Sequence, residues 1–215
     1  MTAAVDLGPH KDRPILFSGP MVRAILDGRK TQTRRVVKSQ PRDGWAPIVG
    51  PYHPTVTDKD GVQQPGPLVY GASDEDEGRK CLYGHPGDRL WVRETWRLGD
   101  HNDAAAGCVH YRADQDEPAA PGQWKPSIHM PRWASRLTLE VKAVRVGRLQ
   151  EISEADAKAE GMTAKHMQLG TKSCHSAFVD LWDDINSKRP GCSWSDNPWV
   201  WVVELERVTP PAPSP

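Results

Sequence analysis

The sequence predicts an α+β fold, in which a small curved sheet or β-barrel carries short helices at its rim. Strand-like segments outnumber helical ones, and their order along the chain favours mainly antiparallel pairing. The helical segments are few and short. The 215 residues include 20 prolines and 18 glycines, which is too loop-rich a composition for an all-helical bundle. A chain of this length suffices for one hydrophobic core.

The first third of the chain is expected to form a strand, a helix and a second strand after a flexible N-terminus over residues 1–12. Residues 15–17 are a short apolar run typical of a buried strand. Ser18 then supplies a helix N-cap, and Gly28 can adopt the left-handed conformation that ends a helix. Residues 31–37 alternate and are β-branched, which predicts a strand.

The middle of the chain is expected to contain two long loop insertions. Residues 39–86 are rich in proline, glycine and acidic side chains, which predicts a partly disordered loop and no separate domain. A glycine and an aspartate then turn the chain into a strand over residues 89–96. Residues 109–112 are a weaker strand, and a second proline-rich loop covers residues 114–131.

The C-terminal third is expected to be strand, helix, helix and strand. Residues 135–148 alternate clearly but change phase near their end, which predicts a bulge. A short helix follows, capped by Ser153 with Asp156 three residues later.

A second helix over residues 175–187 has an apolar stripe, and residues 198–206 form the closing strand. The stripe consists of Phe178, Leu181, Trp182 and Ile185. Residues 13–208 then make a single domain, followed by a proline-rich tail at 209–215.

Charge and composition exclude several classes of protein. Lys and Arg number 28, and so do Asp and Glu, so no overall positive field draws this chain to nucleic acid. No apolar run reaches the roughly 18 residues of a membrane span. The first residues lack the apolar segment of a signal peptide. We therefore expect a cytoplasmic protein without membrane contact.

The four cysteines are expected to be free thiols in that compartment. Cys81 with His85, and Cys108 with His110, fit no standard zinc-binding spacing. The sequence therefore predicts no metal site and no cofactor.

The segment over residues 25–35 has the densest concentration of reactive side chains. Lys30 and Thr33 bring an amine and a hydroxyl near one turn, and such a pair can form an activated nucleophile. Arg34 and Arg35 suit a phosphate or a nucleobase. The alternative is a helix-turn-strand corner with solvated basic residues, which the spacing alone favours. In a regular strand Lys30 and Thr33 would face opposite sides, so they converge only if Lys30 still lies in the turn.

Several motifs together resemble the ASCH domain family. They are Gly28-Arg-Lys-Thr-x-Thr-x-Arg35, Gly87-Asp88 before a strand, and Ala159-Glu-Gly-Met162 at a helix end. From Arg13 to Val208 the chain is also similar to a longer ASCH type encoded by phages and prophages. The resemblance implies a PUA-like β-barrel and a link to RNA or modified nucleosides.

One branch of that family consists of small bacterial N4-acetylcytidine amidohydrolases. By motif match, their catalytic lysine, threonine and glutamate correspond to Lys30, Thr33 and Glu160, and their motif arginine corresponds to Arg35. The resemblance thus implies a metal-independent hydrolase for an N4-acylcytidine nucleoside. This chain departs from those enzymes in its greater length, its long loops and Glu94.

Three further side chains are candidates for substrate binding. Glu94 could accept a hydrogen bond from a cytosine amino group, or form a cross-strand ion pair. Trp133 could stack on a base or plug the end of the barrel. Ser18 stands where backbone amides could hold an anion, although its role as N-cap is sufficient.

Two other functions remain open at this point. One is a non-catalytic RNA-binding module that uses the same arginines together with exposed tryptophans. The other is a phage regulatory protein that acts on a host protein partner through the long loops.

Overall fold

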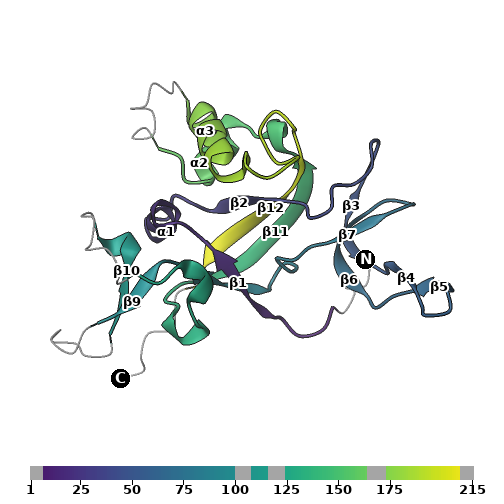
Figure 1. The fold of residues 1–215 in the computed structure, drawn as a ribbon, viewed down its shortest axis with the longest axis horizontal. Coiled ribbons are helices and arrows are strands. Elements are labelled where there is room, and N and C mark those ends of the chain that lie inside the picture. Colours follow the sequence, from purple (N-terminus) through teal and green to yellow (C-terminus); the bar gives the residue numbers. More distant parts are fainter. Residues whose placement is uncertain (1–6, 100–107, 116–123, 164–172, 209–215) are drawn as a thin grey trace.

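The computed structural model describes residues 7–99, 108–115, 124–163 and 173–208 (Figure 1). A five-stranded sheet in the order β1-β8-β11-β12-β2 forms its centre. β1 and β8 run parallel, and every other neighbouring pair is antiparallel. The strands are β1 Asp12–Leu16, β2 Gln32–Val36, β8 Arg89–Arg93, β11 Thr138–Arg148 and β12 Trp199–Arg207.

The sheet confirms the α+β class, but its two outer strands are not paired with each other. No backbone ladder joins β1 to β2 in the described part of the chain. The side chain of Arg35 crosses between them, because its Nη2 donates to the carbonyl of Leu16 at 2.8 Å. Closure into a PUA-like barrel is therefore not seen as backbone pairing and stays a prediction.

The long strand β12 separates two hydrophobic cores. Since successive side chains of a strand point to opposite faces, Trp201 and Val203 pack into the main core with β1, β8 and α1. Val200 and Val202 face the other way and pack against helices α2 and α3. Its partner β11 has a register shift between Val141 and Ala143, which confirms the predicted bulge.

Helix α1, Gly19–Leu26, connects β1 to β2. It buries Val22, Ala24 and Ile25 against the sheet. Ser18 occupies the predicted N-cap position with extended backbone, but its side chain makes no capping hydrogen bond. Gly28 has a φ of 71°, which is the left-handed conformation predicted for the end of this helix.

Helices α2, Glu154–Ala159, and α3, Cys174–Asn186, pack together over one side of the sheet (Figure 1). Ser153 and Asp156 form the predicted capping box of α2. Ile185 was predicted on the buried stripe of α3, and this is wrong, because its side chain is 54% exposed. The buried row instead follows an i, i+4 spacing from Phe178 through Trp182 to Asn186. None of the described helices is long and apolar enough to cross a bilayer.

Residues 39–86, predicted as a partly disordered loop, contain five short strands. β3 Ile48–Tyr52, β6 Val69–Ser73 and β7 Gly78–Lys80 form a three-stranded antiparallel sheet. β4 Thr55–Thr57 and β5 Gln63–Pro65 form a hairpin beside it (Figure 1). These strands are short and interrupted by proline and glycine, so their apolar alternation is too weak to predict them.

The other predicted loop, at residues 114–131, is described only in part. Its described residues include the 3₁₀ turn Ser127–His129, and two more such turns, Arg112–Asp114 and Arg132–Ala134, lie at its ends. The strand predicted over residues 89–96 is divided into β8 and β9, Trp96–Leu98, and β9 pairs with β10, Val109–Tyr111. Residues 1–6 and the tail 209–215 lie outside the described residues.

Candidate functional site

Two of the three predicted catalytic residues, Lys30 and Glu160, meet where the α1–β2 turn touches the end of α2. Lys30 precedes β2 and forms an isolated antiparallel bridge with Glu160, the C-cap of α2. The amide of Thr31 donates to the carbonyl of Ala159 at 2.9 Å. Gly161 has a φ of 93°, and a Cβ there would lie within 3.2 Å of Lys30 Cβ, so a glycine allows the close approach.

The Lys30 amine is completely enclosed. Its side chain is 0% exposed, and Nζ donates to three oxygens. These are the Gln32 carbonyl at 2.8 Å, the Glu160 carbonyl at 3.0 Å and Glu160 Oε2 at 2.7 Å. Burial lowers the pKa of Lys30 below its ordinary value, and the carboxylate of Glu160 opposes part of that effect. Lys30 and Glu160 therefore form a buried acid–base pair that shares a short hydrogen bond.

A second layer of charge holds Glu160 in place. Arg34 is 3% exposed, and its guanidinium contacts Glu160 Oε1 at 3.3 Å and Asp156 Oδ2 at 3.1 Å. Asp156 also accepts hydrogen bonds from Gln32 and Arg145. Burial tends to raise the pKa of Asp156, but hydrogen bonds from Gln32 and Ser153, with the Arg34 charge, hold it well below its usual range.

This network follows from strand periodicity. Lys30, Gln32 and Arg34 are two residues apart, so all three can reach the same neighbour, helix α2. The sequence analysis assigned Asp156 only a capping role and missed Gln32 and Arg145. Polar residues alternate along the strands that precede the apolar closing strand, and this alternation is the signal that could have indicated Gln32 and Arg145. Arg34 thus pairs with the acidic residues of α2 and is almost completely buried, so it is not presented to a ligand in this arrangement.

Thr33 lies on the opposite face of β2 from Arg34, in the main core. It is 1% exposed, and among the described residues its Oγ1 has no hydrogen-bond partner. Arg35 shares this face and lies 5.2 Å from the Phe17 ring, and the Lys30 amine is 5.6 Å from the same ring. Lys30 is still in the turn before β2, as convergence with Thr33 requires, but its amine donates to Gln32 and Glu160 and not to Thr33 Oγ1.

The remaining candidates lie elsewhere. Glu94 follows β8, and its two carboxylate oxygens accept hydrogen bonds from Arg136, one from Nε at 2.9 Å and one from Nη2 at 3.1 Å. The structure therefore gives Glu94 the ion pair that was its alternative, and both oxygens are engaged. Trp133 is 66% exposed and packs edge-on against Trp96. Ser18 is exposed at the start of α1 and is not brought into the Lys30 network.

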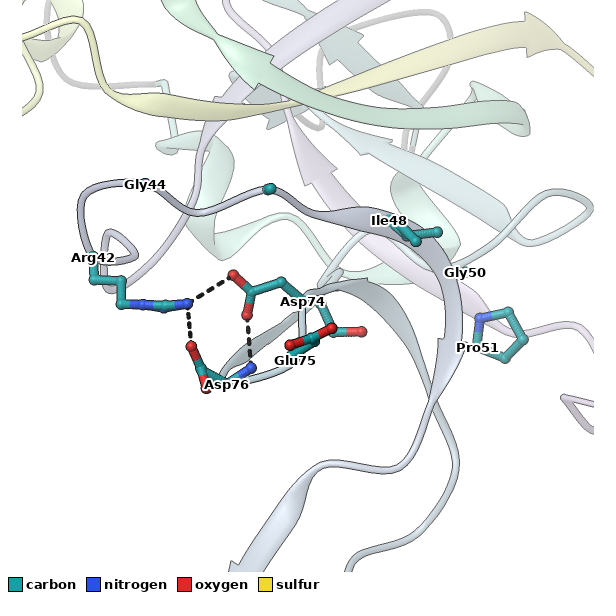
Figure 2. Close-up of a pocket in the computed structure, with 10 residues that line it drawn as sticks. Arg42, Gly44, Ile48, Gly50, Pro51, Asp74, Glu75 and Asp76 are labelled. Carbon is teal, nitrogen blue, oxygen red and sulfur yellow. Dashed lines mark hydrogen bonds and ion pairs between the residues drawn. The ribbon is translucent and has the colours of Figure 1, made fainter.

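A separate cavity of about 630 Å³ lies on the three-stranded sheet of residues 39–86. Figure 2 shows Arg42 reaching across its rim to Asp74 and Asp76, with Ile48 and Pro51 on the opposite wall. The carboxylate of Asp74 also accepts the amide of Asp76 at 3.0 Å, which orders the β6–β7 turn. None of the residues that line this cavity belongs to the Lys30 network.

No family model, curated protein or solved structure matches this chain.

Proposed function

We propose that the chain is a metal-independent amidohydrolase that removes the acyl group from an N4-acylcytidine nucleoside or a related modified base. The observation that carries the proposal is the buried Thr33 hydroxyl, which lacks a partner among the described residues and lies on the strand that follows the Lys30–Glu160 pair. A buried polar atom that remains unsatisfied costs stability, so it requires another explanation. A nucleophile that is completed only when substrate binds is such an explanation.

The Lys30–Glu160 pair can supply both a base and an acid. Moving one proton across the 2.7 Å hydrogen bond converts the ion pair into a neutral amine and a neutral carboxylic acid. Burial lowers the pKa of Lys30, which favours the neutral amine that this transfer produces. The pair then holds an acceptor for a hydroxyl proton and a donor for a leaving nitrogen.

The reaction is a double displacement. The Oγ1 of Thr33 attacks the acyl carbonyl while the Lys30 amine accepts its proton. Glu160 protonates N4 as the carbon–nitrogen bond breaks, which releases cytidine and leaves an acyl ester on Thr33. Water then attacks the ester with the pair acting in reverse, which returns the proton to Thr33 and releases the carboxylic acid. The cations of Arg34 and Arg35 near the amine help to keep Lys30 neutral.

The test is turnover of N4-acetylcytidine, followed by the ultraviolet change to cytidine, with Thr33→Val as the decisive variant. Valine has almost the shape of threonine and no hydroxyl. We expect turnover to fall by roughly 10³-fold or more, as for loss of a nucleophile. We also expect thermal stability to be unchanged or raised, since an unsatisfied buried hydroxyl is removed.

Thr31→Val is the matched control, because Thr31 lies in the same turn but is exposed. It should keep wild-type turnover. A Thr33→Val variant that keeps full turnover contradicts the mechanism. A Thr33→Val variant that is strongly destabilised shows instead that the hydroxyl has a structural partner.

The alternative of RNA binding has its own support on the surface near β8. Trp133 is exposed, and the guanidiniums of Arg93 and Arg132 lie 5.5 Å and 5.8 Å from the Trp91 ring. Exposed aromatic rings beside arginines can stack on unpaired bases. If this surface binds RNA, affinity should fall steeply with salt and should drop on Trp133→Ala, with Thr33→Val having no effect.

A further inference from the structure

Two histidines and one aspartate come together at the start of the five-stranded sheet. His10 precedes β1, and His85 and Asp88 lie in the turn before β8. Their nearest ligand atoms all lie within 4.8 Å of one another. Asp88 Oδ1 is 3.5 Å from His85 Nε2 and 3.9 Å from His10 Nδ1. None of these residues belongs to the Lys30 network or to the Trp133 surface.

A hydrogen bond to the backbone fixes which ring nitrogen of His85 faces Asp88. Its Nδ1 is 2.9 Å from the carbonyl of Pro86, and a carbonyl can only accept a hydrogen bond, so Nδ1 carries the proton. In this tautomer the lone pair of Nε2 points towards the carboxylate oxygen Oδ1 of Asp88. Two acceptors that face each other at 3.5 Å repel unless a cation lies between them. A ring held through Nδ1 by a backbone carbonyl is also how metal-binding histidines are oriented.

The Asp88 carboxylate is buried and is held in place by several donors. Its side chain is 0% exposed, and Oδ2 forms an ion pair with Arg13 and accepts the amide of His85. The amide of Lys11 donates to Oδ1 at 2.7 Å, which leaves a lone pair of Oδ1 free on the histidine side.

Two glycines allow the backbone to come this close. Gly84 and Gly87 have φ values of 94° and 93°. A Cβ at Gly84 would clash with the Asp88 carboxylate, and one at Gly87 would clash with the His10 ring. The turn is therefore shaped around the three side chains.

We propose that His10, His85 and Asp88 bind a divalent transition metal of the zinc class. Metal–ligand bonds of about 2.0–2.1 Å in a tetrahedral site place ligand atoms about 3.3 Å apart. The distances from Asp88 Oδ1 to the two histidines, 3.5 Å and 3.9 Å, are slightly longer, and all three ligand atoms lie within 4.8 Å of one another. Two imidazoles favour zinc, cobalt or nickel over magnesium and calcium, which prefer oxygen. His10 is 66% exposed, so the remaining coordination positions open to water. The metal would tie the segment before β1 to the turn before β8.

The spacing of cysteines and histidines predicts no metal site, because His10 lies 75 positions before His85 and no local motif joins them. Cys81 is close by in the chain, but burial raises the pKa of its thiol to about 11, so it stays protonated and is a poor ligand. Cys108 is exposed and could bind metal weakly. The experiment is therefore made in a Cys108→Ser background.

The test is a titration of tag-free full-length protein with Co²⁺ at pH 7.5, read by visible absorption and confirmed by competition with Zn²⁺. We expect one equivalent of Co²⁺ with bands of a nitrogen–oxygen site. His85→Ala should weaken binding at least about 10- to 100-fold, because loss of a ligand costs no less than loss of its outer partner. His10→Ala should weaken it as well. Zn²⁺ should raise the melting temperature of the parent and leave the His85→Ala melting temperature unchanged.

His129→Ala is the matched control, because His129 is exposed and lies outside the cluster. It should bind Co²⁺ like the parent. Binding that persists equally in His85→Ala, or no binding at all by the parent, overturns the proposal. The proposal is also overturned if the protein does not respond to metal but becomes more stable on acidification. That result would identify the cation between His85 and Asp88 as a proton on His85. Circular dichroism tests whether the His85→Ala variant is folded. If it is not, the His85→Gln variant is used in its place.

Discussion

Replacing Glu160 with alanine should lower the free energy of unfolding by about 3–5 kcal/mol, the cost of removing one partner of a buried ion pair. The Lys30 amine is completely buried and would lose its nearest acceptor, and Arg34 would lose one of its two carboxylate contacts. An uncompensated buried charge is the costly element. Urea unfolding followed by tryptophan fluorescence measures the difference.

The matched double variant separates the charge from the shape. Lys30→Met combined with Glu160→Leu removes both charges and keeps apolar volume, and well-packed replacements of buried pairs are often neutral in stability. We expect the double variant to recover most of the stability that Glu160→Ala loses, while N4-acetylcytidine turnover stays absent. If the double variant is as unstable as Glu160→Ala, the backbone bridge between these positions, and not charge pairing, dominates the effect.

Replacing Arg136 with alanine should cost about 3 kcal/mol at pH 7, because Glu94 would remain buried without its partner. Glu94 is 1% exposed, and Arg136 contacts both of its oxygens. Burial raises the pKa of Glu94, and Arg136 opposes this, so the variant should raise the pKa further. A raised pKa in the folded state adds stability at low pH and loses it as pH rises through that pKa.

The deficit of Arg136→Ala should therefore shrink as pH falls from 7 towards 5, where Glu94 takes up a proton. Thermal melts of variant and parent across this range measure it. Arg132→Ala is the control, because its ion pair with Asp12 is exposed and should contribute less than about 1 kcal/mol at any pH. A deficit that is constant with pH would show that lost packing of Arg136 on Tyr111, and not charge, causes it.

The central sheet was predictable because its strands carry a strong local signal. β11 alternates along much of its length, and the phase change that marks the bulge can be read directly from the sequence. β12 begins with an apolar run that is typical of a buried strand. The strands of residues 39–86 could not be predicted, since three to five residues broken by proline or glycine carry no usable period. Their pairing depends on partners distant in sequence, such as Tyr52 opposite Val69.

The candidate site was predictable in part for the same reason. The resemblance indicated Lys30, Thr33 and Glu160, and the structure brings Lys30 and Glu160 into contact. The structural role of Glu94 depends on its ion pair with Arg136, which is 42 residues away, and the sequence alone does not pair these two residues. His10 and Asp88 are separated by 78 positions and meet only because β1 and β8 run parallel.

The Arg35 contact between the two outer strands has a consequence for access. In the described part of the chain no backbone ladder joins the outer strands β1 and β2, and the hydrogen bond from Arg35 to the Leu16 carbonyl connects them through a side chain. A boundary between strands that has no backbone ladder can open locally, at a fraction of the free energy of global unfolding. Thr33 lies on the strand that borders it, so a buried hydroxyl can become reachable while the rest of the sheet stays intact. Amide hydrogen exchange should then be faster along the free edge of β2 than along β12, and Arg35→Ala should widen the difference.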